Sequence, residues 1–205
     1  MRSGKLSRIG AVVVTGAMFA TQMQGCVVPI AVGAIGAGVY AATDRRSLGA
    51  QADDKVIESR VSSRIDDALS NRAHINVTSF NRKVLVTGEV PDEAARQKAE
   101  QIAKSVDNVQ SVVADLEIGG MTPASARNND AFITTKVKAE LVNTKDVFAN
   151  AYKVVTEKRI VYLMGRVTQA EGNRAASIAS GVSGVAKVVK VFDYITEDEL
   201  AQLKK

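Results

Sequence analysis

The pattern of hydrophobic and polar positions along this chain repeats after about 76 residues. In the first half, apolar side chains at helical spacing are followed by a β-prone apolar run, a second helical stretch and a final apolar run. The same order returns in the second half, where Ile133 and Gly165 correspond to Ile57 and Gly88. The chain therefore contains two copies of one unit of roughly 65 residues, each large enough for a small core.

Each copy predicts the element order helix, strand, strand, helix, strand. In the first copy, Ile57, Val61 and Ile65 recur at helical spacing, and Asn81-Arg82 separates two runs of strand-like alternation. The second helix is expected to begin at Pro91, because proline suits the first helical position. The predicted fold class is α+β, with a three-stranded sheet packed against two helices in each copy.

The repeat and the composition of the flanking residues divide the chain into six segments. They are a lipoprotein signal peptide at 1–25, a lipidated cysteine with an Ala/Gly-rich linker at 26–52, the first copy at 53–118, a linker at 119–129, the second copy at 130–196 and a C-terminal tail at 197–205. Since the linker between the copies is short, we expect the copies to pack together.

The N-terminus has the pattern of an exported lipoprotein. Three basic residues precede an apolar run of about a dozen residues, which is shorter than the ~20 that a membrane span requires. Gly25 then precedes Cys26, the only cysteine, in an arrangement that resembles a bacterial lipobox. This resemblance implies that acyl and diacylglyceryl groups, palmitate included, are attached to Cys26. The alternative is an ordinary signal peptide followed by a free cysteine.

The residues after Cys26 indicate where the chain resides. By resemblance to the sorting of lipoproteins in Gram-negative bacteria, Val27 rather than aspartate at the next position implies the outer membrane, with the chain facing the periplasm. A second apolar stretch runs to Ala42, but Pro29 and three glycines interrupt it. We expect a flexible segment close to the leaflet rather than a second membrane span.

Charge is divided unevenly between the two copies. Residues 53–118 hold 9 Lys+Arg and 12 Asp+Glu, a net −3, whereas residues 130–196 hold 10 and 6, a net +4. Three positive charges lie in the leader, so the sequence pI of about 9.3 does not indicate a nucleic-acid partner. A basic second copy tethered at a membrane favours anionic headgroups, at ~1 kcal/mol for each lysine or arginine near the surface.

The sequence contains no recognisable catalytic constellation. His74 is the only histidine and has no cysteine or second histidine to share a metal, so we interpret it as an ordinary surface or turn residue. The pairs Asp53-Asp54 and Asp66-Asp67 are interpreted as solvated or N-terminal charges of a helix rather than acid–base groups. No glycine cluster is followed by the Lys-Ser/Thr of a phosphate loop. We expect no enzyme activity, no metal and no cofactor besides the covalent lipid on Cys26.

The repeated unit resembles the BON domain, a small module of bacterial envelope proteins. The resemblance rests on an apolar strand that runs into a glycine, on the helix that follows and on a closing V-x-x-V-x-x-V-V pattern. The segments that carry it are 42–47, 76–78, 83–88, 129–137 and 178–185. The whole chain resembles dual BON-domain outer-membrane lipoproteins. This implies a non-enzymatic role in envelope integrity, including at the cell division site.

The resemblance also implies an anionic phospholipid site on the first helix of the second copy, which begins with an aromatic residue in this family. Here Phe132 replaces the Val56 of the first copy, and an amphipathic helix with aromatic and basic residues suits a membrane interface. The residues predicted to bind phospholipid are Phe132, Ile133, Lys136, Lys138 and Val142. The alternatives are that Phe132 belongs to the core and that the two lysines are solvated without a role.

A second hypothesis makes the protein a periplasmic adaptor. In that case the basic second copy would bind an acidic surface of a protein, possible partners being components of the outer-membrane assembly machinery.

Overall fold

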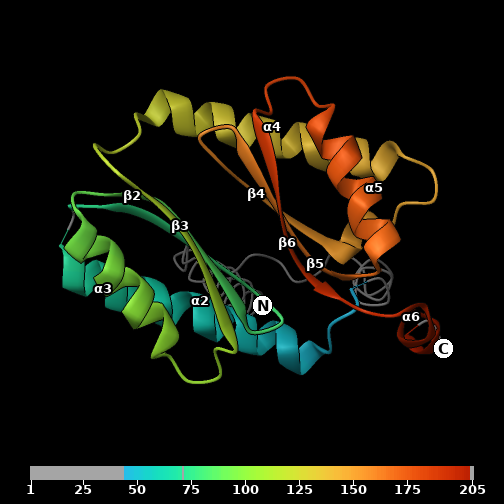
Figure 1. Cartoon of the computed structure of the whole chain (residues 1–205), viewed down its shortest axis with the longest axis horizontal. Coiled ribbons are helices and arrows are strands. Elements are labelled where there is room, and N and C mark those ends of the chain that lie inside the picture. The colour runs from blue at the N-terminus through green and yellow to red at the C-terminus, as the bar shows by residue number, and fades with distance from the viewer. Residues whose placement is uncertain (1–43, 71, 204–205) are drawn as a thin grey trace, which may run out of the picture. The chain divides into compact units, whose positions relative to one another are not determined.

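Two copies of the order helix, strand, strand, helix, strand follow one another along the chain (Figure 1). The protein was analysed as a computed structural model, which describes residues 44–70 and 72–203. The first module comprises α2 (Leu48–Leu69), β1 (His74–Phe80), β2 (Lys83–Val90), α3 (Glu93–Lys104) and β3 (Ser111–Ile118). The second comprises α4 (Ala124–Asn143), a 3-10 turn (Ala149–Ala151), β4 (Tyr152–Glu157), β5 (Ile160–Val167), α5 (Gln169–Ser180) and β6 (Lys187–Tyr194), and α6 (Glu197–Leu203) follows. The predicted α+β class is confirmed.

Both sheets have the same topology. The second strand of each module is central: it pairs antiparallel with the strand before it and parallel with the strand after the second helix. A parallel pair requires a crossover connection, and α3 and α5 supply it. In the first hairpin, Asn81 and Arg82 have φ of 51° and 64°, as a tight two-residue turn of the type that matches strand twist requires.

The helices of each module cover one face of its sheet. In the first module, Val61 from α2 and Val84 from β2 belong to the same buried cluster, and Val137 and Val161 are their counterparts in the second. The other faces of the two sheets share a third buried cluster. It contains Phe80, Leu85, Tyr162, Met164 and Val191. The two modules therefore pack together, as the short linker predicts.

Several helical segments lie outside the boundaries predicted from the repeat. The helix α2 begins at Leu48, inside the predicted linker 26–52, because the Ser47 side chain caps it by accepting from Ala50 N. The helix α4 begins at Ala124, so much of the predicted linker 119–129 is helical, and the predicted tail contains α6. The apolar repeat marks only the turns that pack on a sheet, and the helices extend beyond them.

The residues before α2 are also fixed by contacts with both modules. Arg45 donates two hydrogen bonds to the Glu171 carboxylate of α5, at 2.7 and 2.6 Å. Arg46 pairs with Asp54 of α2 at 2.8 Å and lies 4.1 Å from the centre of the Phe80 ring. This short segment is therefore a bridge between modules rather than a free linker.

Candidate functional site

The helix α4 carries an exposed apolar pair on the side that faces away from its sheet. Ile133, Val137 and Leu141 recur at helical spacing and are buried, so they orient the helix. Phe132 and Val142 are 61% and 67% exposed. They are ten positions apart, which places them roughly 80° from one another around the helix and on the same outward side.

Two lysines flank this apolar pair. Lys138 is exposed, and Lys136 is half-buried on the opposite edge of the outward face. The Lys136 ammonium donates to the carbonyl oxygen of Ser183 and lies 5.0 Å from the centre of the Phe132 ring. A cation at that distance from an aromatic face is attracted to it, so the ring and the charge are held together. We call Phe132, Lys136, Lys138 and Val142 the α4 face.

The prediction of Ile133 as a lipid-binding residue is wrong. Ile133 is 1% exposed and belongs to the core of the second module, so its side chain cannot contact a membrane in this fold. Adjacent residues of an α-helix are rotated by about 100° from one another, so Phe132 points outward while Ile133 points towards the sheet. Cys26, the predicted lipid attachment site, lies outside the described residues.

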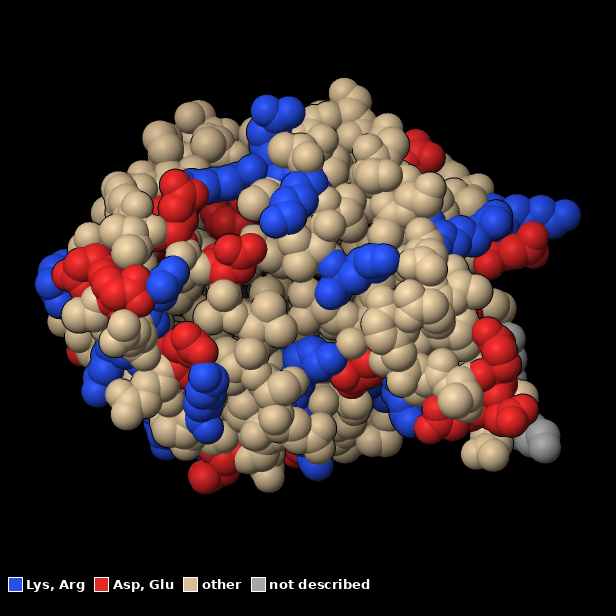
Figure 2. All heavy atoms as spheres, in the orientation of Figure 1, with Lys and Arg blue, Asp and Glu red and all other residues tan. Residues whose placement is uncertain are grey.

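Charge and shape around the α4 face are those of a basic, hollowed surface. Figure 2 shows mostly uncharged and basic side chains over α4, whereas acidic side chains gather over α6. A cavity of about 540 Å³ between α4 and α5 is lined by Lys136, Ser177 and Ser183 among others. None of the helices in the described ranges is long and apolar enough to cross a membrane.

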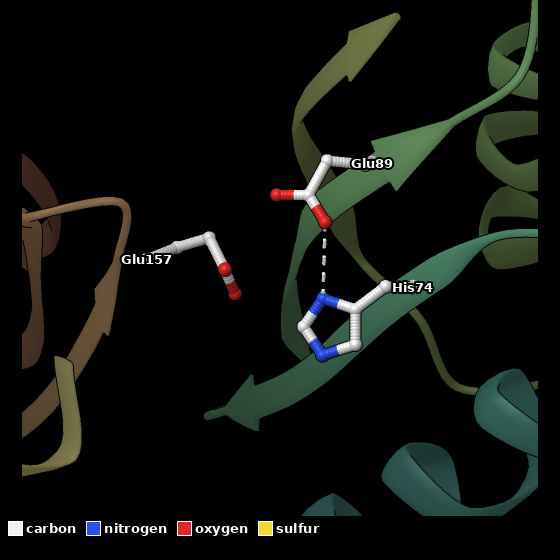
Figure 3. A group of neighbouring side chains, drawn as sticks. All are labelled: His74, Glu89 and Glu157. Carbon is white, nitrogen blue, oxygen red and sulfur yellow. Dashed lines mark ion pairs between the residues drawn. The ribbon is translucent and has the colours of Figure 1, made fainter. Parts of the chain in front are cut away.

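A second group of polar side chains lies where the modules meet (Figure 3). His74 and Glu89 are direct partners in the register of β1 and β2, and Glu157 ends β4 of the other module. One ligand atom from each lies within 4.8 Å of the other two. The His74 side chain is 16% exposed, and both glutamates are buried. The interpretation of His74 as an ordinary surface or turn residue is therefore wrong.

Hydrogen bonds orient both carboxylates of this cluster. Glu89 accepts from the backbone N–H of Thr122 at 3.0 Å and from its hydroxyl, and it lies 3.3 Å from Lys158 Nζ. Burial acts to raise the pKa of Glu89, but these partners outweigh it and hold that pKa below its usual value. Burial raises the pKa of Glu157, and the 2.6 Å hydrogen bond from Asn76 offsets this only in part.

The imidazole of His74 has an unusual environment. Its Nδ1 atom is buried and makes no hydrogen bond with the described residues, although Glu89 Oε2 lies only 3.3 Å away. A cavity of about 450 Å³, lined in part by His74, Asn76 and Glu157, opens beside it. Imidazole and carboxylate groups are ligands for divalent transition metals, so the cluster could hold a cation.

Two buried aspartates, Asp54 and Asp130, cap the hairpin turns of the two modules. Asp54 is 1% exposed and accepts from the backbone N–H groups of Asn81 and Arg82 in the first hairpin turn. Its counterpart Asp130 does the same for the turn of the second module. The prediction of Asp54 as a solvated or N-terminal helix charge is wrong, because Asp54 is buried and α2 begins at Leu48. Each aspartate precedes the first buried isoleucine of its helix by three positions, on the apolar stripe. This recurrence in both copies was the sequence signal for a buried cap.

Comparison with known proteins places both modules in one family. The family model for the BON domain matches residues 53–120 and 129–196. The chain is 38% identical over 178 residues to the outer membrane lipoprotein DolP of Haemophilus influenzae, covering 84% of this chain and 90% of that protein. It is 36% identical to a 21 kDa hemolysin of Actinobacillus pleuropneumoniae, with coverage of 74% and 79%. It is 30% identical to osmotically-inducible protein Y of Escherichia coli, with coverage of 74% and 78%.

Proposed function

We propose that this protein, which belongs to the BON domain family and is an outer-membrane lipoprotein, binds anionic phospholipid through its α4 face. The observation that carries the proposal is the exposure of Phe132 and Val142, 61% and 67%, between two lysines of the basic module. Large apolar side chains left in water next to cations suit the boundary between headgroups and acyl chains. Contact of this kind would support envelope integrity without any catalytic step.

The lipid anchor is the second part of the proposal. Cys26 would carry the acyl chains that hold the protein at the outer membrane, facing the periplasm. Because an anchored domain cannot diffuse away, its effective concentration at the surface is high, and a weak contact is enough to keep the α4 face at the bilayer.

The expected strength of the contact follows from the exposed groups. Transfer of the exposed parts of Phe132 and Val142 out of water contributes about 1–2 kcal/mol each, since full burial of such side chains contributes about 1.5–3 kcal/mol. Lys136 and Lys138 add ~1 kcal/mol each near an anionic surface. The sum of about 4–6 kcal/mol corresponds to a dissociation constant of roughly 0.04–1 mM, which is weak for a free protein and sufficient for a tethered one.

The test is co-sedimentation of the chain from Val39 onward with lipid vesicles. This form contains the single compact unit in which all described residues lie and omits the anchor, so binding reports on the folded part alone. We expect pelleting with phosphatidylglycerol vesicles and little with phosphatidylcholine vesicles. Phe132→Glu should abolish the difference, whereas Leu48→Glu, a matched change at a 74% exposed residue of α2, should not.

Two outcomes would contradict the proposal. One is equal pelleting with the two vesicle types, and the other is unchanged binding by Phe132→Glu. If neither vesicle type is bound while crosslinking in cells recovers a stoichiometric protein partner, the adaptor hypothesis is favoured instead.

A further inference from the structure

The cluster at the contact of the two modules contains chemistry that lipid binding does not use. Buried ionisable groups are costly unless they are paired or bind a metal. Here Glu89 and Glu157 are 0% and 5% exposed, and Asp130 also lies close enough to Glu157 to act on its pKa. Lys158 pairs with Glu89 at 3.3 Å and also with the exposed Glu117 at 2.8 Å.

We propose that His74, Glu89 and Glu157 bind one divalent transition-metal cation, for which Zn²⁺ is the best match. One imidazole nitrogen and two carboxylates form a ligand set that zinc accepts, whereas magnesium and calcium prefer oxygen ligands alone. Because His74 and Glu89 belong to the first module and Glu157 to the second, the cation would join the modules at their contact.

The distance between His74 and Glu89 matches a metal-bound arrangement, and Glu157 lies near both. Two ligands that each lie about 2.0–2.1 Å from a tetrahedral zinc are about 3.3 Å from one another. His74 Nδ1 and Glu89 Oε2 are 3.3 Å apart, and all three ligand atoms fall within 4.8 Å. At that separation an imidazole N–H beside a carboxylate would be expected to donate to it, yet Nδ1 makes no hydrogen bond within the described part of the chain.

The surroundings of the cluster are those of an oriented metal site. Metal-binding carboxylates are usually held by hydrogen bonds from a second layer of groups. Thr122 holds Glu89 with its backbone N–H and its hydroxyl, and Asn76 holds Glu157. The cavity of about 450 Å³ beside His74 gives a path for the cation and leaves room for a water ligand. Three protein ligands with an open position are typical of zinc sites that retain a water.

The chain is well suited to a direct test, because His74 is its only histidine. We would purify the full-length chain in detergent without a polyhistidine tag, treat it with a chelator and titrate it with zinc chloride. The readout is the ¹H–¹⁵N spectrum of the imidazole, with calorimetry in parallel. We expect the Nδ1 resonance to shift and saturate at one equivalent, with no such shift on titration with magnesium chloride.

Variants separate this site from weak binding of zinc to surface carboxylates. His74→Gln and Glu157→Gln should each weaken zinc binding by about 10–100-fold. Glu93→Gln, which removes an exposed carboxylate of α3, is the matched control and should bind as the parent does. Zinc should also raise the melting temperature of the parent chain but not that of His74→Gln.

Two results would overturn the proposal. The first is an imidazole spectrum that does not change at saturating zinc, and the second is a His74→Gln variant with the zinc affinity of the parent. The vesicle assay does not depend on this cluster, so failure here would leave the proposed lipid binding intact.

Discussion

Replacement of Asp54 by alanine tests whether this buried aspartate holds the first hairpin turn. The Asp54 carboxylate accepts from the Ser79 hydroxyl at 2.6 Å, from the Asn81 and Arg82 N–H groups at 2.7 and 2.8 Å, and from the Arg46 guanidinium at 2.8 Å. At about 1 kcal/mol for each hydrogen bond lost, Asp54→Ala should lower the free energy of unfolding by about 4 kcal/mol. That is a large share of the ~5–15 kcal/mol typical of folded domains.

The second module provides an internal comparison. Asp130 accepts from the N–H groups of Lys158 and Arg159, at 2.9 and 2.8 Å. With two hydrogen bonds instead of four, Asp130→Ala should cost about 2 kcal/mol. Asp53→Ala is the surface control. The Asp53 side chain is 36% exposed and that of its ion-pair partner Arg82 is 41% exposed, so loss of this pair should lower the free energy of unfolding by less than about 1 kcal/mol.

The assay is urea denaturation followed by circular dichroism, with native-state hydrogen exchange to show which module opens. Asp54→Ala should speed exchange in residues 74–90, and Asp130→Ala should speed it in residues 152–167. Equal costs for the two variants, or a cost below about 1 kcal/mol for Asp54→Ala, would refute the view that these carboxylates hold the turns.

The same carboxylate predicts a dependence of stability on pH. Burial acts to raise the pKa of Asp54, but the hydrogen bonds from Ser79, Arg82, Asn81 and Arg46 outweigh burial and lower that pKa. A carboxyl with a depressed pKa in the folded state stabilises the fold above its unfolded-state pKa of about 3.9. This stabilisation is lost as the pH falls further, through the folded-state pKa. Asp54→Ala should therefore flatten the fall in stability below about pH 4.

Gly88, Tyr152 and Arg45 each make a contact whose loss can be measured. Gly88→Ala should prevent stable folding of the first module, because a Cβ there would lie 1.9 Å from a backbone carbonyl oxygen of β1 and the residue has a φ of +123°. Gly119→Ala is the control: a Cβ at Gly119 has open space, so this variant should be neutral in the same urea assay. Burial, together with the charge of Glu171, raises the pKa of Tyr152 to about 12, so the stabilising effect of this tyrosine is complete below about pH 10 and is lost as the pH rises towards 12. If Tyr152→Phe removed a step near pH 10 from the ultraviolet titration, this would be contradicted. Arg45→Ala removes both hydrogen bonds to the Glu171 carboxylate and should lower the free energy of unfolding, measured by urea denaturation, by about 2 kcal/mol. A loss under about 0.5 kcal/mol would argue against a bridging role for Arg45.

The repeated pattern predicted the fold because a helix or strand reveals itself through the spacing of its apolar positions. It also contained the signal for the buried caps. Asp54 precedes Ile57 by three positions and Asp130 precedes Ile133 by three, so each aspartate lies on the stripe that faces the sheet. A charged residue on a buried stripe, present in both copies, indicates a structural partner and not a solvated charge.

Other features depend on how the two modules meet, and no periodicity within one copy reports that. The pairing of His74 with Glu89 could be read from the strand register, but Glu157 reaches them only because the sheets pack together. The prediction of Ile133 as a lipid contact failed for a local reason. It grouped residues by their nearness in sequence, whereas helix geometry divides adjacent positions between the outward and inward sides.

The most direct test of lipid contact uses the absence of tryptophan from the chain. Phe132→Trp introduces a single indole on the α4 face, and Leu48→Trp introduces one at an exposed position of the first module as a control. The account predicts that phosphatidylglycerol vesicles shift the emission of Phe132→Trp to shorter wavelength, that phosphatidylcholine vesicles do not, and that Leu48→Trp responds to neither. An emission from Phe132→Trp that stays the same with phosphatidylglycerol vesicles, or that shifts equally with both lipids, would contradict it.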